Sequence, residues 1–280
     1  YTTLFRSTGN WQGSFTLPAG VIGDTTVWGS VLPDGGLFFY TNSSLDHNAL
    51  YGRLIRYENN VTNNRFVTAN DGVFFNRLLA NTGAYNESVL IDGTLQSGDG
   101  TSTAGLFSGS FSYPTQPGGF PTRFSVTPDP LYALPSGKVP NAALIVGTYK
   151  MAGTGFGGDT TTLTVFADGA ITGLTTSGCE VAGKLLGELG SGLNLYRVEA
   201  FGYLNSPNAP ITCGLSSGPP QSGSASAQFD ANGKVIGLRI LTAGLSVAGT
   251  RAHTVFVGDS AGGTLSLVTL NRSLRFCQKP

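Results

Sequence analysis

The sequence predicts an all-β protein built from two tandem antiparallel β-meander domains of related design, each a small barrel or sandwich. Three observations indicate this class. Apolar residues alternate with polar ones at a period of two, Asp-Gly and Asn-Gly pairs separate the alternating segments, and the two halves of the chain share short motifs in the same order. No window of a dozen residues has the 3.6-residue period of an amphipathic helix.

The alternation is clearest between residues 162 and 174. Leu163 and Val165 alternate with threonines, Asp168-Gly169 follows, and a second alternating segment begins at Ala170. This pattern is typical of a β-hairpin, and we expect Asp-Gly to form a two-residue type I′ turn. Asp-Gly pairs also begin at Asp34, Asp71, Asp92 and Asp99, and Asn232-Gly233 is expected to turn a further hairpin between residues 227 and 240.

The two halves resemble distant copies of one unit. Four pairs of motifs occur in the same order at nearly constant separation: residues 9–13 with 147–149, 25–36 with 161–169, 51–54 with 182–185, and 64–67 with 194–198. One such coincidence would mean little, but four in order indicate an internal duplication followed by divergence.

Prolines mark the boundary between the halves. Seven of the 14 prolines fall between residues 114 and 140. Because proline lacks a backbone donor, such a stretch is neither a helix nor a central strand, and it predicts an extended connector. We therefore expect a first domain at 1–128, a proline-rich connector at 129–141 and a second domain at 142–280.

Composition excludes several classes of partner and suggests a compartment. Charged residues are 11% of the chain, and 16 basic residues balance 16 acidic ones without a basic stripe, which argues against nucleic-acid binding. No apolar run is long enough for a transmembrane helix. We expect Cys179 and Cys213 to form a disulfide in an oxidising compartment, with Cys277 left over; three buried thiols are the alternative.

One short motif suggests catalysis. Val255–Gly263 contains Gly-Asp-Ser-Ala-Gly, which resembles the nucleophile elbow of hormone-sensitive-lipase-like esterases and the Gly-Asp-Ser-Gly of trypsin-like proteases. This resemblance implies Ser260 as a nucleophile, with His253 as a nearby base. No Asp, Glu or His follows Ser260, however, so the esterase order of acid and then histidine is missing. We expect a glycine-rich loop here, and the sequence predicts no metal site and no cofactor.

Aromatic residues are the candidate ligand contacts. Trp28, Phe39, Tyr40 and Phe75 lie in aromatic-rich segments of the first half. Successive side chains of a strand point to opposite faces, so one of Phe39 and Tyr40 should face outward, where it could stack on a sugar ring or anchor a partner. The alternative is that these residues fill a barrel core.

The run from Tyr149 through Asp168-Gly169 and Cys179 to Gly183 resembles the Gly/Thr-rich β-meander domains of bacterial surface or periplasmic lipoproteins. The two-domain arrangement is similar to that of transferrin-binding and factor-H-binding lipoproteins. The resemblance implies a secreted, periplasmic or cell-surface protein, with any lipid anchor outside these residues, that binds an unknown macromolecular or glycan partner without catalysis. Two alternatives remain: a carrier that holds a small ligand in a lipocalin-like barrel, and a serine hydrolase using Ser260.

Overall fold

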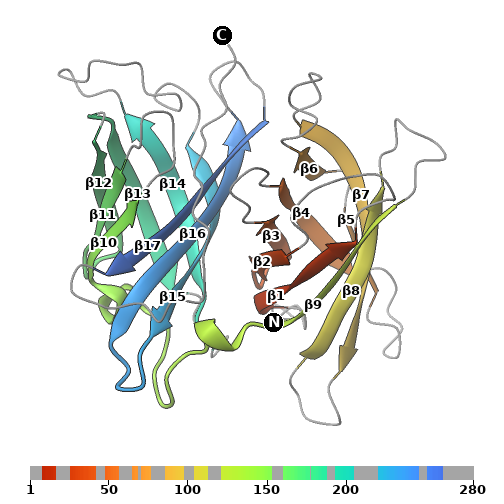
Figure 1. Ribbon diagram of the computed structural model, residues 1–280, viewed down its shortest axis with the longest axis horizontal. Helices are drawn as coiled ribbons and strands as arrows, with labels where there is room; N and C mark the ends of the chain where they lie inside the picture. The colour runs from red at the N-terminus through yellow and green to blue at the C-terminus, as the bar shows by residue number, and fades with distance from the viewer. Residues whose placement is uncertain are drawn as a thin grey trace. The chain divides into compact units, whose positions relative to one another are not determined.

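The computed structural model describes residues 8–16, 26–41, 48–56, 65–68, 71–76, 86–97, 104–112, 121–152, 160–176, 178–187, 193–204, 220–245 and 251–260. The chain divides into two compact units, Tyr1–Pro130 and Leu131–Pro280 (Figure 1). Each unit is a closed antiparallel β-sheet, so the predicted all-β fold with two tandem domains is confirmed. Neither 3-10 helix among the described residues has the length to span a membrane.

The first unit is a barrel in which every pairing is antiparallel. Its strands are β1 (Gly9–Thr16), β2 (Thr26–Val31), β3 (Gly36–Thr41), β4 (Asn48–Arg56), β5 (Arg65–Thr68), β6 (Gly72–Asn76), β7 (Asn86–Ser97), β8 (Ala104–Ser112) and β9 (Thr122–Pro128). Strand β9 pairs with β1, and β3 pairs with β4, which closes the sheet.

Strands β5 and β6 share one position in this barrel. Both pair with β4 on one side and with β7 on the other, but the register of β6 is shifted by two residues relative to β5 on both sides. They are therefore one strand interrupted by a bulge. The Asp71 carboxylate at the bulge accepts a hydrogen bond from the Arg53 backbone N–H (3.2 Å), which supplies the partner that the interrupted ladder does not.

The second unit is an eight-stranded closed barrel in simple up-and-down order. Its strands are β10 (Gly147–Ala152), β11 (Thr160–Val165), β12 (Ala170–Thr175), β13 (Glu180–Gly187), β14 (Tyr196–Leu204), β15 (Gln221–Phe229), β16 (Val235–Leu245) and β17 (Arg251–Ser260). Its β14 also carries a bulge, marked by register shifts on both sides and by Ala200 at φ 51°. The same strand position is thus irregular in both barrels, in keeping with the internal duplication.

The hairpin turns form where glycines predicted them, but their type differs from the expectation. In the β2–β3, β11–β12 and β15–β16 turns, Gly35, Gly169 and Gly233 have φ of +89°, +86° and +75°, while the preceding Asp or Asn does not have a positive φ. Each glycine N–H bonds to the carbonyl three residues back (2.9 to 3.0 Å). These are three-residue loops, a type I turn followed by a left-handed glycine, rather than type I′ turns.

Two other Asp-Gly pairs are not hairpin turns. Asp71 lies at the bulge between β5 and β6, and Asp92-Gly93 lies in the middle of β7, so both expectations were wrong. Gly93 has a packing role: a Cβ there would come within 2.9 Å of the Phe107 ring and 3.1 Å of the Phe124 ring. The pair beginning at Asp99 lies outside the described residues.

The two barrel interiors differ in composition. Aromatic rings dominate the first core: Trp11, Phe15, Phe39, Phe74, Phe107, Phe111 and Phe124. Several of these rings meet edge to face, including Phe107 and Phe124 with centroids 5.1 Å apart. Aliphatic side chains make up most of the second core, together with Tyr149, Tyr196, Phe201 and Phe256.

The proline-rich segment belongs with the second barrel from Leu131 onward. One 3-10 helix, η2 (Pro130–Tyr132), lies where we expected an extended connector at 129–141, and a second, η3 (Ala142–Ile145), follows at the start of the expected second domain. Asn194, almost fully buried, donates to the carbonyl oxygens of Tyr132 (3.0 Å) and Ala227, and the Arg239 guanidinium lies 3.8 Å from the centre of the Tyr132 ring. The segment is thereby attached to the barrel wall.

Candidate functional site

The aromatic ligand candidates of the first barrel lie in different environments. Phe39 is 2% exposed and packs in the core against the rings of Phe107 and Phe124. Its predicted role as a ligand contact is not supported by this position, which matches the core-filling alternative. The side chain of Phe75 lies outside the part of the chain that the structure describes.

Trp28 and Tyr40 form a cross-strand pair on the other face of the same sheet. They are directly opposite each other on β2 and β3, with ring centroids 6.0 Å apart. Tyr40 is only 3% exposed, and Trp28 is partly buried. The pair faces away from the barrel core, as the alternation predicted, but Tyr40 does not present an open stacking platform.

The structure does not bring Ser260 and His253 together. Both lie on β17, and seven residues at about 3.3 Å each separate their backbones by ~23 Å. A serine nucleophile needs its base within hydrogen-bond reach. Ser260 pairs with Tyr149 and its hydroxyl is buried, without a hydrogen-bond partner among the described residues. Residues 255–260 form a strand rather than the expected loop, because Val255 and Val257 alternate with Phe256 on opposite faces.

Cys179 is 5% exposed and lies in the second core, just before β13. Its backbone N–H donates to the Thr175 hydroxyl (2.9 Å). Cys213 and Cys277 lie outside the described residues, so the Cys179–Cys213 disulfide stays a prediction.

Buried polar side chains gather at one end of the second barrel, where β10, β12, β14 and β16 finish. We call this the threonine end and define it by Thr161, Thr175, Gln221 and Thr242, each no more than 4% exposed. Their strand positions place them on the inner face. Leu163 and Ile240 are core residues, so their side chains point inward. Thr161 and Thr242 each lie two residues from one of them on the same strand and therefore point inward as well, and Thr175 is directly paired with Thr161.

The four residues form two pairs on opposite walls. Thr161 and Thr175 are directly paired on β11 and β12. On β15 and β16 the Thr242 hydroxyl donates to the Gln221 side-chain carbonyl (2.6 Å). These two pairs of strands are four positions apart around an eight-stranded ring, so they face each other across the interior.

Apolar side chains separate the two polar walls. Met151 on β10 pairs with Thr161, and Phe201 on β14 pairs with Gln221. Both belong to the core, and β10 and β14 are also four positions apart around the ring. The threonine end is therefore lined by polar and apolar walls in alternation.

The first barrel gives an internal comparison for this lining. By strand position and register, Val27, Val89, Ile91 and Phe111 correspond to Thr161, Gln221, Gly223 and Thr242. At these four places the second barrel has polar side chains, or none, where the first has bulky apolar ones. Two positions change in the other direction, from Gly13 to Met151 and from Gly72 to Phe201. Thr175 corresponds to Thr41, which is also buried, so this threonine is common to both copies, whereas the positions of Thr161, Gln221 and Thr242 are polar in the second copy only.

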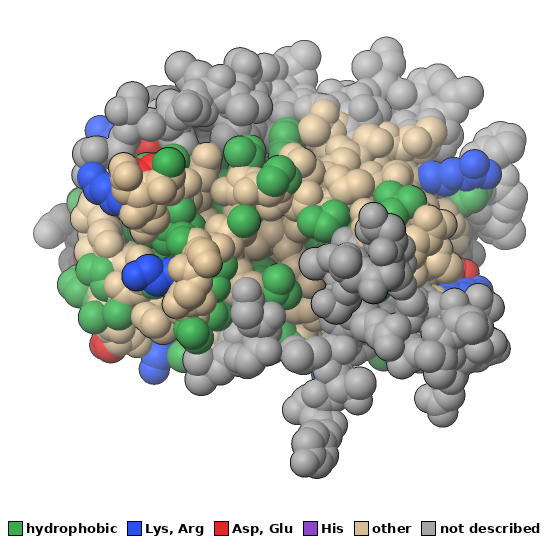
Figure 2. Space-filling view, turned by 90° about the horizontal axis from the view of Figure 1, so that it is seen from below, with side chains coloured by type: hydrophobic (Ala, Val, Ile, Leu, Met, Phe, Trp, Pro, Cys, Tyr) green, Lys and Arg blue, Asp and Glu red, His purple; other side chains and the backbone are tan. Residues whose placement is uncertain are grey.

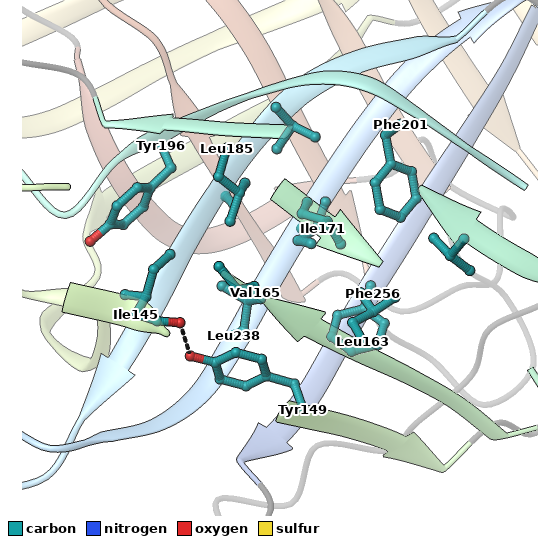
Figure 3. Close-up of a cluster of buried hydrophobic side chains, with 14 of the residues drawn as sticks. Ile145, Tyr149, Leu163, Val165, Ile171, Leu185, Tyr196, Phe201, Leu238 and Phe256 are labelled. Carbon is teal, nitrogen blue, oxygen red and sulfur yellow. Dashed lines mark hydrogen bonds between the residues drawn. The ribbon is translucent and has the colours of Figure 1, made fainter. Parts of the chain in front are cut away.

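The opposite end of the second barrel is apolar and includes η3. Ile145 is fully buried, and its carbonyl accepts a hydrogen bond from the Tyr149 hydroxyl at 2.6 Å (Figure 3). The Tyr196 hydroxyl is buried without a hydrogen-bond partner among the described residues. Burial raises the pKa of both tyrosines above its ordinary value, and for Tyr196 the neighbouring Tyr149 adds to the rise. Both side chains are therefore neutral at physiological pH.

The described residues contain no group of three or more His, Cys, Asp and Glu side chains placed to hold a metal ion. Where the face in Figure 2 shows described residues, Lys, Arg, Asp and Glu side chains lie singly or in small groups among hydrophobic and other atoms.

Sequence reasoning missed the threonine end because its members come from four strands. The available signal was a threonine or glutamine at an inward position of an alternating segment, as in Thr161 before Leu163. Comparisons with protein-family models, with curated proteins and with solved structures found no match for this chain.

Proposed function

We propose that this chain is an exported binding protein without catalytic activity, and that the threonine end of its second barrel holds a small ligand. The observation that carries the proposal is the pair of facing polar walls formed by Thr161 with Thr175 and by Gln221 with Thr242. Burial of a polar side chain costs free energy that a hydrogen bond only offsets, as between Thr242 and Gln221 or between the Cys179 N–H and Thr175, whereas three of the four corresponding positions in the first barrel are apolar. An eight-stranded barrel is wide enough to hold one small ligand.

The other two hypotheses have less support. Binding of a macromolecule or glycan through exposed aromatic residues relied on Phe39 and Tyr40, which are 2% and 3% exposed. Hydrolysis through Ser260 relied on His253, which lies seven residues away on the same strand.

Native mass spectrometry tests the proposal. Protein purified from a bacterial host should carry a small-molecule adduct that disappears on denaturation. The adduct should be lost in the Thr161→Val, Thr242→Val double variant, which keeps side-chain shape but removes two hydroxyls. Thr172→Val is the matched control, because Thr172 is exposed on the outer face of β12. A wild-type protein without any adduct would count against a ligand in this barrel.

Export is supported by the low content of charged residues and by the three cysteines. We propose that Cys179 and Cys213 form a disulfide. Reduction should then raise the mass by about 2 Da, and peptide mapping of the non-reduced protein should link the peptides that contain these two cysteines. A link between Cys179 and Cys277 would refute this pairing and leave export itself to be judged by cell fractionation.

A further inference from the structure

The lining of the threonine end also restricts the chemistry of the ligand. Building on the proposed function, we infer that the second barrel binds one small, uncharged, ring-shaped molecule with hydrogen-bonding groups on two opposite edges and apolar faces. A monosaccharide and a heteroaromatic amide both have this chemistry.

Charge is the first restriction. The described inward residues at this end are threonine, glutamine, glycine, methionine, phenylalanine, Val181 on β13 and Cys179 just before that strand. None carries a charge. A carboxylate or ammonium group buried there would lose its hydration without meeting an ion of opposite sign, which strongly disfavours a charged ligand.

Shape is the second restriction. The polar walls lie on β11–β12 and on β15–β16, while Met151 and Phe201 occupy the positions between them on β10 and β14. A molecule that satisfies both polar walls must present hydrogen-bonding groups on opposite edges. Its two faces then lie against a thioether and an aromatic ring, which favour apolar or π surfaces.

Size is the third restriction. The second barrel has Thr242 and Gly223 as a directly opposite pair where the first barrel has Phe111 and Ile91. These smaller side chains fill less of the interior beside β15 and β16, while Met151 and Phe201, in place of Gly13 and Gly72, fill more of it beside β10 and β14. Below them, Leu163, Leu238 and Ile240 are fully buried core residues. The site is therefore limited to one small ring rather than an extended chain.

Saturation-transfer NMR and calorimetric titration with matched probes test this inference. Glucose and nicotinamide are the uncharged ring probes, and glucuronate and nicotinate are their carboxylate counterparts. Wild-type protein, freed of any adduct by dialysis, should bind at least one uncharged probe. Its carboxylate counterpart should bind at least about tenfold more weakly, because no cationic side chain receives it.

The variants connect binding to the threonine end. Thr161→Val with Thr242→Val should weaken binding of the uncharged probe about tenfold or more, and Thr172→Val should leave it unchanged. Circular dichroism of each variant controls for folding. If the double variant does not fold, Gln221→Glu provides the second test: its carboxylate should also abolish binding of the uncharged probe while Thr172→Val retains it.

The outcomes separate the ligand class from the proposed function. Equal binding of a probe and its carboxylate counterpart would overturn the inference of an uncharged ligand. A native adduct without binding of either ring probe would overturn the ring class while leaving a ligand in the barrel. Absence of both the adduct and probe binding would overturn the proposed function as well.

Discussion

Tyr149 and Tyr196 occupy the same core but differ in one hydrogen bond. The Tyr149 hydroxyl donates to the Ile145 carbonyl, whereas the Tyr196 hydroxyl has no partner among the described residues. A buried polar group that loses its partner costs more free energy than a hydrogen bond contributes on average. The two hydroxyls should therefore contribute differently to stability, although burial raises the pKa of both.

Replacement of each tyrosine by phenylalanine measures this difference. Tyr149→Phe should lower the free energy of unfolding by about 1 to 2 kcal/mol near neutral pH, because the Ile145 carbonyl loses its donor. Tyr196→Phe should lower it less or not at all. Urea denaturation followed by circular dichroism gives both values. A larger loss for Tyr196→Phe would show that its hydroxyl has a partner after all.

The same tyrosines should make the second barrel sensitive to alkali. Their folded pKa is raised above the unfolded value of about 10, so the unfolded state releases its protons first. Their contribution to stability is complete below about pH 10 and falls as the pH rises toward the folded pKa. Each phenylalanine variant should lose less stability than the wild type between about pH 8 and about pH 11. Parallel losses in all three proteins would contradict a raised pKa.

At the scale of the elements, glycine in the left-handed conformation sets the hairpin turns. Gly169 and Gly233 have nearly the same φ, +86° and +75°, but different surroundings. A Cβ on Gly169 would lie 2.1 Å from the Leu185 carbonyl oxygen, whereas the nearest atom to a Cβ on Gly233 would be the Pro135 Cβ at 3.8 Å. The first turn is thus tied to β13 by close packing, and the second is not.

Alanine substitutions separate backbone conformation from packing. Gly233→Ala should cost about 1 to 2 kcal/mol, the ordinary penalty of a left-handed alanine. Gly169→Ala should cost clearly more, because the Leu185 carbonyl is backbone and cannot move without shifting β13. Thermal or urea unfolding of the two variants checks the order. Equal losses would mean that the β11–β12 turn can move away from β13.

At the scale of the whole molecule, each unit has its own hydrophobic core. The first is centred on aromatic rings such as Phe107, and the second on aliphatic side chains such as Leu238. Units with separate cores can unfold in separate transitions. We expect two transitions in differential scanning calorimetry of the intact chain.

Core truncations assign the transitions. Leu238→Ala should destabilise one of them by about 2 to 5 kcal/mol, and Phe107→Ala should destabilise the other by about 3 to 5 kcal/mol. A single transition that both variants lower equally would show that the two barrels unfold as one cooperative unit.

Much of the fold could be predicted because its signals are local in the sequence. Alternation around Leu163 and Val165 indicated strands, and glycines at 35, 169 and 233 indicated hairpins. The turn type was missed because a type I′ turn and a three-residue loop can use the same residues. The two differ only in which of those residues has a positive φ. Asp92-Gly93 was misplaced because a glycine in a strand beside Phe107 looks the same in sequence as a glycine in a turn.

The candidate site was harder to predict than the fold. Alternation correctly placed Phe39 and Tyr40 on opposite faces, but it does not reveal what covers the outer face, and Tyr40 is buried. Ser260 and His253 are close in sequence, yet an extended strand separates them. Proximity in sequence brings side chains together only when the chain turns back between them.

The sequence by itself determined the all-β class, the two domains, the duplication and the positions of the principal hairpins, because each depends on residue spacing within one segment. Only the tertiary structure decided which strands close each barrel and which inward residues share an end. Thr161, Thr175, Gln221 and Thr242 are up to 81 residues apart in sequence, and the closure of eight strands places them on facing walls. Register and closure are long-range properties, and these properties create the candidate site.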